Sequence, residues 1–255
     1  MLLPLKDDNP LIRISFQRVT VSLIVICCLV FMWQLSLSTE ESNAAVLGLG
    51  AIPAVLFGDK YLEPDLVLVS TNLTLLTSMF LHGGWMHLIG NMLFLWVFGD
   101  NVEDCLGHRR FIIFYVFSGI GGALTHALVN PESVAPMIGA SGAISGILGA
   151  YLVLHPRAQV LVLAFMYIPI RLPAFVILGL WIGLQMLNAS VEGSADGGGT
   201  AWWAHIGGFI AGIGLLFLLR KKTKANSDDD GPWGKRRSAT VVTSDTPNPV
   251  DRRKR

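Results

Sequence analysis

Six apolar stretches, most of them about as long as a membrane-spanning helix, constrain this chain more than any other feature. They cover residues 19–37, 85–100, 111–129, 137–155, 173–187 and 201–219. Because a helix rises about 1.5 Å per residue, about 20 apolar residues cross a bilayer core about 30 Å thick. Charged residues make up 15% of the sequence, whereas soluble domains carry about 25%. These observations predict an all-α polytopic membrane protein with six transmembrane helices.

Two further apolar stretches do not fit a single span. Residues 44–80 are interrupted by glycine and proline, at Gly48, Gly50, Pro53, Gly58 and Pro64, and both residue types disfavour a continuous helix. We expect a large first outer loop there, partly embedded in the membrane. Residues 160–170 are apolar but too few to span, and Pro156 and Pro169 border the run. We expect an interfacial connection there, with a longer fifth span as the alternative.

Basic residues alternate between the two sides of the predicted bundle. Lys and Arg are retained on the cytoplasmic side of membrane proteins. They lie before the first span, in the second-to-third and fourth-to-fifth loops, and after the last span: Lys6, Arg13, Arg18, Arg109, Arg110, Arg157, Arg171, Arg220, Lys221, Lys222 and Lys224. The opposite loops hold only Lys60 among several acidic residues. Six spans with both ends of the chain in the cytoplasm place every loop that is rich in basic residues on the cytoplasmic side.

The same pattern divides the chain into three parts. We expect residues 1–18 to form a cytoplasmic N-terminus and residues 19–220 a six-helix membrane domain. Residues 221–255 are polar and should form a disordered cytoplasmic tail. The basic residues at 252–255 favour contact with anionic lipid headgroups, and a solvated tail without a role is the alternative.

Composition excludes several classes of partner and cofactor. The net charge is +1 and no basic face is evident, which argues against a nucleic-acid partner. Cys27, Cys28 and Cys105 fit neither a disulfide framework nor a metal-binding spacing. No His-Glu-x-x-His zinc motif is present. The sequence therefore calls for no metal and no organic cofactor, and the partner it implies most directly is the lipid bilayer.

Polar side chains inside the predicted spans mark the candidate site, because such groups are costly in lipid. The strings are HGGWMHLIGN at 82–91, GASG at 139–142 and AWWAHIGG at 201–208. His87, Ser141 and His205 each lie about four to six residues past the outer boundary of their span, or about 6–9 Å deep. Asn91 lies one turn beneath His87 on the same helix face. Three helices should therefore bring a hydroxyl and two imidazoles to one level.

Such a set can perform acyl transfer. A serine hydroxyl is a weak nucleophile until a neighbouring base, usually a neutral histidine, takes its proton. This chemistry makes Ser141 the candidate nucleophile and a neighbouring histidine its candidate base. Backbone N–H groups at the helix start, with the side chains of His87 and Asn91, would stabilise an oxyanion.

Each of these residues has a structural alternative when taken singly. Small residues spaced four apart allow helices to pack closely, and a lone His or Asn can hydrogen-bond between helices. The small residues are Gly142, Gly146, Ala150, Gly208 and Gly212. The shared depth of the polar side chains favours the catalytic interpretation.

In order and separation, these motifs resemble those of the rhomboid family of intramembrane serine proteases. The similarity covers roughly residues 65–220 and includes Glu103 and Gly107 in an E-x-x-x-G pattern. The resemblance implies a bacterial-type six-span bundle in which Ser141 is the nucleophile and His205 its base, with no acid completing a triad.

The resemblance also implies roles for other positions and for the whole protein. By position, the oxyanion hole would comprise His87, Asn91 and the Ser141 N–H, and the supporting residues would be His82, Gly139 and Gly142. The expected substrates are transmembrane proteins, cut near the outer ends of their helices. The expected location is the bacterial cytoplasmic membrane, with the site opening outward. The alternative is a rhomboid-like protein that binds membrane clients without cutting them.

The sequence departs from the family pattern at two places, and the resemblance also suggests where substrates enter. The Trp-Arg pair typical of the first outer loop in bacterial members is absent from residues 38–80, and Ser145 occupies a position where some members have a tyrosine stacked on the histidine. Two explanations for the orientation of His205 therefore stay open: a hydrogen bond from Ser145, or packing against a neighbouring helix. The fifth span with the glycine-rich loop 193–199 is the candidate substrate gate, and a simple connector is the alternative.

Overall fold

The computed structural model describes residues 2–164, 167–192 and 200–220. Two predictions, the disordered tail at 221–255 and the gate loop at 193–199, lie outside the described residues. Residues 1–221 form one compact unit, to which all the described elements belong.

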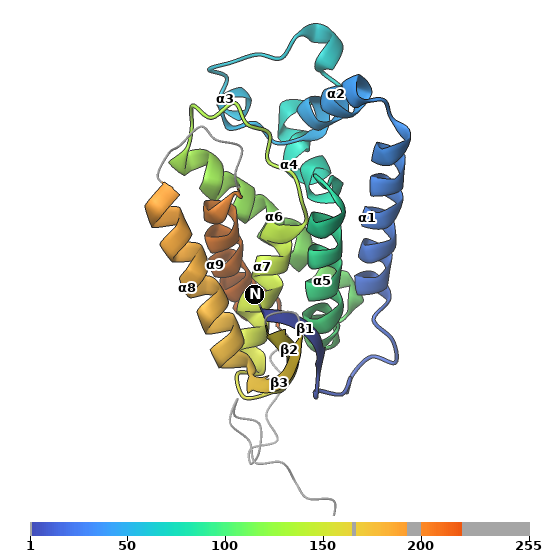
Figure 1. Cartoon of the computed structure of the whole chain (residues 1–255), viewed down its shortest axis with the longest axis vertical. Helices are drawn as coiled ribbons and strands as arrows, with labels where there is room; N and C mark the ends of the chain where they lie inside the picture. The colour runs from blue at the N-terminus through green and yellow to red at the C-terminus, as the bar shows by residue number, and fades with distance from the viewer. Residues whose placement is uncertain (1, 165–166, 193–199, 221–255) are drawn as a thin grey trace, which may run out of the picture. The chain divides into compact units, whose positions relative to one another are not determined.

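Six long helices correspond to the six predicted spans. They are α1 (Arg18–Ser36), α5 (Trp85–Leu106), α6 (His108–Val129), α7 (Ser141–Leu154), α8 (Ala174–Glu192) and α9 (Trp202–Leu219) (Figure 1). Helices α1, α6, α8 and α9 are long and apolar enough to cross a membrane, and α5 is so together with residues 64–80, from which it is bent by 82°. The polytopic helical fold is confirmed. Helix α7 has only 14 residues, so the count of six spans stays a prediction.

The fourth helix begins later than the sequence indicates. The apolar run starts at 137, but Met137 exchanges backbone hydrogen bonds with Ala51. Gly139 then has a φ of +121°, which a helix does not allow. Helix α7 therefore begins at Ser141, and this residue lies at the helix start rather than about one turn inside it.

The predicted first outer loop is a succession of short helices. They are α2 (Thr39–Leu49), α3 (Pro53–Leu56), η1 (Pro64–Leu66), η2 (Thr71–Leu73), α4 (Thr74–Thr77) and η3 (Ser78–Phe80). Helix α2 begins with a capping box between Ser38 and Glu41, and the hydrogen bonds from Ser38 hold the pKa of Glu41 below its ordinary value. A Cβ on Gly48 would overlap the carbonyl of Leu66. The loop therefore folds closely on itself at one end of the helices (Figure 1).

A three-stranded sheet at the other end of the helices was not predicted (Figure 1). Strands β1 (Leu2–Asp7), β2 (Gln159–Ala164) and β3 (Ile168–Pro173) pair antiparallel in the order β1-β2-β3. Every second residue of β2 is buried, which is the period of a strand rather than of a helix. The alternative of a longer fifth span is wrong, because residues 160–164 and 168–170 of the apolar run lie in β2 and β3, and α8 begins only at Ala174.

Strand β1 is also bound to the helices by a buried carboxylate. Asp7 accepts hydrogen bonds from the Tyr151 hydroxyl of α7 and from Asn101 Nδ2 of α5. Burial raises the pKa of Asp7 above its ordinary value. The N-terminal segment therefore contacts two of the central helices.

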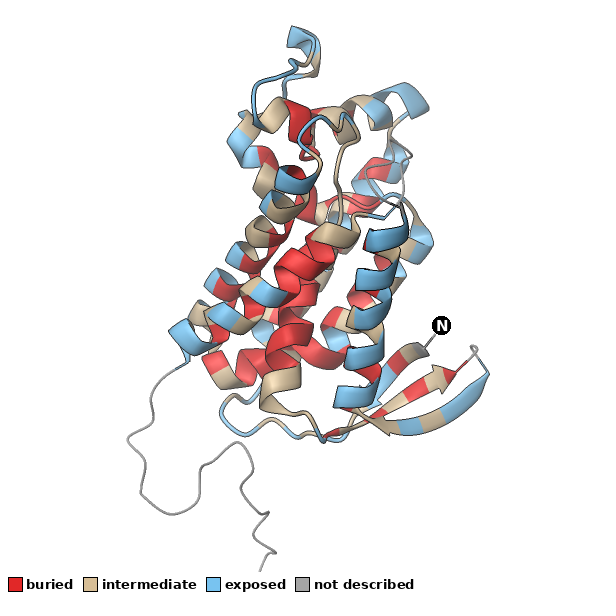
Figure 2. Cartoon of the chain, turned by 90° about the vertical axis from the view of Figure 1, so that its left-hand side faces the viewer, coloured by how far each residue is buried: buried red, intermediate tan, exposed pale blue. Residues whose placement is uncertain are grey.

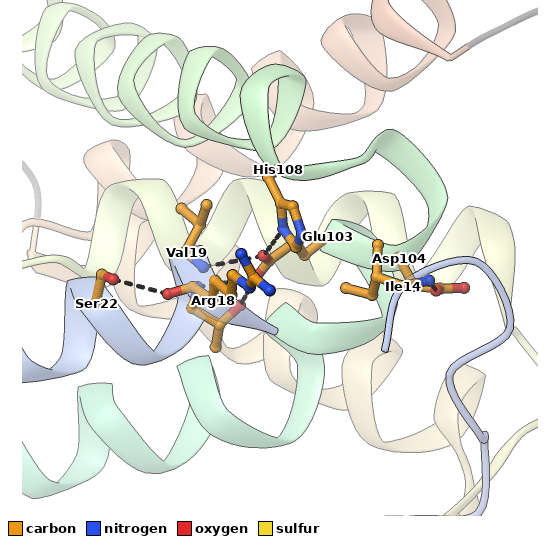
Figure 3. A network of polar contacts seen from close by, with 8 residues as sticks. Ile14, Arg18, Val19, Ser22, Glu103, Asp104 and His108 are labelled. Atoms are coloured by element: carbon orange, nitrogen blue, oxygen red, sulfur yellow. Dashed lines mark hydrogen bonds and ion pairs between the residues drawn. The ribbon is translucent and has the colours of Figure 1, made fainter. Parts of the chain in front are cut away.

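Acidic residues at the end of α5 hold the chain that enters α1 (Figure 3). Glu103 is fully buried and accepts hydrogen bonds from the N–H groups of Val19 and Thr20. Asp104 accepts from the N–H groups of residues 12–14. The first N–H groups of a helix have no partner within it, so a carboxylate there is favourable. Glu103 of the E-x-x-x-G pattern therefore caps α1.

Helix α7 is the buried centre of the bundle (Figure 2), and α9 packs against it backbone to backbone. Every residue of α7 from Gly142 to Tyr151 is buried. A Cβ on Gly208 would overlap the carbonyl oxygen of Gly142, and a Cβ on Gly212 would overlap that of Gly146. The predicted small-residue faces therefore form the contact between α7 and α9.

Candidate active site

The close contact of α7 and α9 brings Ser141 and His205 together. Ser141 is the first residue of α7, and His205 lies in the first turn of α9. His205 Nε2 is 2.9 Å from Ser141 Oγ, a distance suited to proton transfer. His205 is 8% exposed, whereas Ser141 is partly exposed. The imidazole is therefore shielded, while Ser141 keeps part of its surface exposed.

Gly139 places the turn before Ser141 against side chains of α5. Its φ of +121° is one that residues with a side chain rarely adopt. A Cβ there would lie 2.7 Å from His87 Nε2 and 3.6 Å from Asn91 Nδ2. The backbone thus favours glycine at this position, and a Cβ would also displace the ring of His87. His87 and Asn91 lie beside the turn that leads to Ser141.

Asn91 carries a hydrogen-bond donor without a partner. The residue is 9% exposed, and within the described part of the chain its Nδ2 makes no hydrogen bond. Most buried polar atoms in proteins are paired, so this donor is available to a further acceptor. The first N–H groups of α7 also lack acceptors within their helix. These donors lie near the turn 139–141, where they can receive a negatively charged oxygen.

The contacts of His82 and Gly142 are with neighbouring elements of the fold. The backbone N–H of His82 donates to Gln34 Oε1 over 3.0 Å, and its Nδ1 lies 3.2 Å from the carbonyl oxygen of Phe80. Its ring packs edge-on against that of His87, with the centroids 5.2 Å apart. His82 therefore helps to position His87. Gly142 lies where α9 approaches α7 closely, because its carbonyl oxygen faces Gly208.

A residue that the sequence analysis missed, Gln185 of α8, contacts the other side of His205. Gln185 Oε1 lies 2.7 Å from His205 Nδ1. Ser145, one of the two candidates for orienting His205, instead donates its hydroxyl to the carbonyl of Ser141 over 2.6 Å. The other candidate, helix packing, is met by Trp181, whose ring centroid lies 5.8 Å from that of His205. The sequence signal that could have identified Gln185 is its polar amide inside an apolar span, because such a group is costly in lipid.

Comparisons with known proteins identify relatives of this chain. Residues 70–222 match the family model described as Rhomboid domain. Rhomboid protein 1, mitochondrial, from Saccharomyces cerevisiae is 34% identical over 181 residues, which cover 67% of this chain and 49% of that protein. RHOMBOID-like protein 5 from Arabidopsis thaliana is 35% identical over 161 residues, which cover 62% of this chain and 48% of that protein. Rhomboid protease GluP from Bacillus subtilis is 36% identical over 161 residues, which cover 62% of this chain and 28% of that protein. The chain thus spans about half or less of each relative's length.

Proposed function

Because this chain belongs to the rhomboid family, we propose that it is an intramembrane serine endopeptidase that hydrolyses peptide bonds in or near the transmembrane helices of other membrane proteins. The observation that carries the proposal is the 2.9 Å contact between Ser141 Oγ and His205 Nε2 within an apolar helix bundle. A hydroxyl held by an imidazole is the minimal arrangement for an activated serine nucleophile. The relative from Bacillus subtilis is itself named a rhomboid protease.

The proposed reaction proceeds in two acyl-transfer steps. Ser141 Oγ attacks the carbonyl carbon of the scissile bond while His205 Nε2 takes the hydroxyl proton. His205 then gives this proton to the leaving amine, and a water molecule, activated by the same nitrogen, releases the acyl group. The developing oxyanion is stabilised by Asn91, His87 and the N–H groups at the start of α7.

The position of the site agrees with transmembrane substrates. Ser141 lies at the α7 terminus next to the first outer loop, since the N–H of Gly139 donates to the carbonyl of Ser78 over 2.8 Å. Water can reach this end of the bundle, while a substrate helix arrives through the bilayer. The test of the proposal is co-expression with a panel of single-span reporters, scored for cleavage by the wild type and by Ser141→Ala.

Removal of the Asn91 amide should lower turnover rather than binding. The oxyanion forms only in the transition state, so we expect kcat for Asn91→Ala to fall about 100-fold with little change in KM. Steady-state kinetics on a purified reporter measure both constants. Ile89→Ala, an exposed position on the same helix, is the matched control and should behave as wild type. A rise in KM at constant kcat would make Asn91 a substrate contact instead.

The membrane orientation gives a further prediction. We place both ends of the chain on the cytoplasmic side of a bacterial cytoplasmic membrane, because the basic residues gather in that set of loops. Reporters fused after Cys105 and after Lys224 should then lie in the cytoplasm, and a reporter fused after Asp59 should lie outside. Alkaline phosphatase and green fluorescent protein fusions distinguish the two sides. A cytoplasmic reading at Asp59 would contradict this orientation.

A further inference from the structure

A buried amide on α8 connects that helix to His205 of α9. Gln185 is 6% exposed. Its Nε2 donates a hydrogen bond of 3.1 Å to the carbonyl of Trp181, one turn earlier in α8. Its Oε1 lies 2.7 Å from His205 Nδ1. Both ends of the amide are therefore engaged.

These contacts determine which atoms carry hydrogen. A backbone carbonyl only accepts, so the NH₂ end of Gln185 faces Trp181 and the amide oxygen faces His205. An amide oxygen also only accepts, so His205 carries its proton on Nδ1. In a neutral imidazole the other nitrogen is then unprotonated, and this is the Nε2 that lies 2.9 Å from Ser141 Oγ. The lone pair of His205 thus points at the hydroxyl that it would deprotonate.

We propose that Gln185 is a positioning residue that sets the tautomer and the orientation of His205. The inference rests on the proposed peptidase function. When Nε2 takes the proton of Ser141, the resulting imidazolium keeps its Nδ1–H bonded to the amide oxygen, and no proton passes to Gln185. A neutral acceptor thereby orients the base as the aspartate does in a serine protease triad, but it adds no charge to the membrane interior.

The location of Gln185 makes the base dependent on α8. Of the described side chains of this helix, the buried ones are Ala174, Ile177, Leu178, Gln185 and Ala189. Three of them lie in the first two turns, so the second half of α8 is held to the bundle by few side chains. If α8 moves away from α9, His205 loses its acceptor, and its two tautomers become free to exchange. The position of α8 thus controls whether His205 is ready to act.

Two replacements of similar size test this role. Gln185→Met keeps the length of the side chain but removes the acceptor. Gln185→Glu keeps an oxygen toward Nδ1 and, as a neutral acid, still donates to the carbonyl of Trp181. We expect kcat to fall about 10- to 100-fold in Gln185→Met with KM nearly unchanged, and to stay within about threefold of wild type in Gln185→Glu. If Gln185 served packing alone, the order would be reversed, because a buried apolar site accepts Met more readily than a carboxyl group.

A spectroscopic readout separates positioning from stability. In protein labelled with ¹⁵N-histidine, the His205 signals, assigned by their loss in His205→Ala, should show the Nδ1–H tautomer in wild type and in Gln185→Glu. Gln185→Met should show a mixture of tautomers. Ser190→Ala is the matched control, because it removes a hydrogen bond of 2.7 Å to the carbonyl of Leu187 on the exposed face of the same helix. This variant should keep the wild-type kcat and the wild-type spectrum.

Turnover of Gln185→Glu that does not exceed that of Gln185→Met would overturn the inference. The proposed function would survive that result, provided that Ser141→Ala is inactive in the same assay. Conversely, an active Ser141→Ala variant would remove the proposed function, whatever the variants at Gln185 do.

Discussion

Ser141→Ala is expected to abolish cleavage of every single-span reporter that the wild type cuts. Loss of a serine nucleophile leaves only the contributions of binding and of the oxyanion hole, so the rate should fall by at least about 10⁴-fold. His205→Ala should cause the same loss, and the double variant should be no slower, because nucleophile and base act as one unit. The free energy of unfolding should change by no more than about 1 kcal/mol in Ser141→Ala, since one hydrogen bond is lost.

Immunoblots of co-expressed reporters and thermal unfolding in detergent measure the two quantities. Ser22→Ala is the matched control, because Ser22 is an exposed serine of α1 whose hydroxyl donates to the carbonyl of Arg18 within its own helix. Residual cleavage by Ser141→Ala, or partial losses that add up in the double variant, would contradict the assignment of the dyad. A folded wild type that binds reporters but cuts none would favour the non-proteolytic alternative.

Gly212→Ala should inactivate the protein from a position about two turns below the site. Its Cβ would overlap the carbonyl of Gly146, and backbone atoms cannot move aside as the end of a side chain can. Helices α7 and α9 must then separate by about 1 Å, and overpacking of this kind costs about 1–3 kcal/mol or more. The contact of 2.9 Å between Ser141 and His205 would open beyond hydrogen-bonding distance. We expect at least about a 100-fold loss of cleavage together with a lower Tm.

Gly214→Ala provides the control on the same helix. A Cβ on Gly214 meets no atom within 4 Å, so the substitution should leave cleavage unchanged. The Tm should stay the same or rise, because alanine favours a helix over glycine by about 1 kcal/mol. Cleavage assays and thermal unfolding of the two variants, side by side, test the role of the contact. Equal behaviour of both variants would mean that the close approach of α7 and α9 is unimportant.

The parts of the fold that depend on local composition could be predicted from the sequence. The hydrophobic stretches identify the six long helices, since lipid requires long apolar runs whatever the tertiary packing. The polar residues in these runs, Ser141 and His205 among them, stand out because their burial in lipid is costly. Their positions along the predicted spans indicate that Ser141 and His205 lie at the same depth in the membrane. In the structure, His205 Nε2 lies 2.9 Å from Ser141 Oγ.

The parts that depend on contacts between distant segments could not be predicted. Strand β1 pairs with β2 across most of the chain, and no local period marks residues 2–7 as a strand. The start of α7 depends on the pairing of Met137 with Ala51, which is also a contact between segments far apart in the sequence. Gln185 lies 20 residues before His205, and its role requires that two helices face each other at that level.

The junction between the sheet and α8 makes this helix a lever arm. Strand β3 runs directly into α8, and the first two N–H groups of the helix, at Ala174 and Phe175, bond the carbonyls of Ala158 and Pro156 over 2.9 Å each. This end is therefore a fixed pivot. Gln185 lies eleven residues along the helix from Ala174, or about 16 Å from the pivot. A rigid tilt of about 10° would displace its amide by about 3 Å, which is enough to break a hydrogen bond. A small rotation at the end of α8 next to the sheet would thus be amplified into a complete loss of contact between Gln185 and His205.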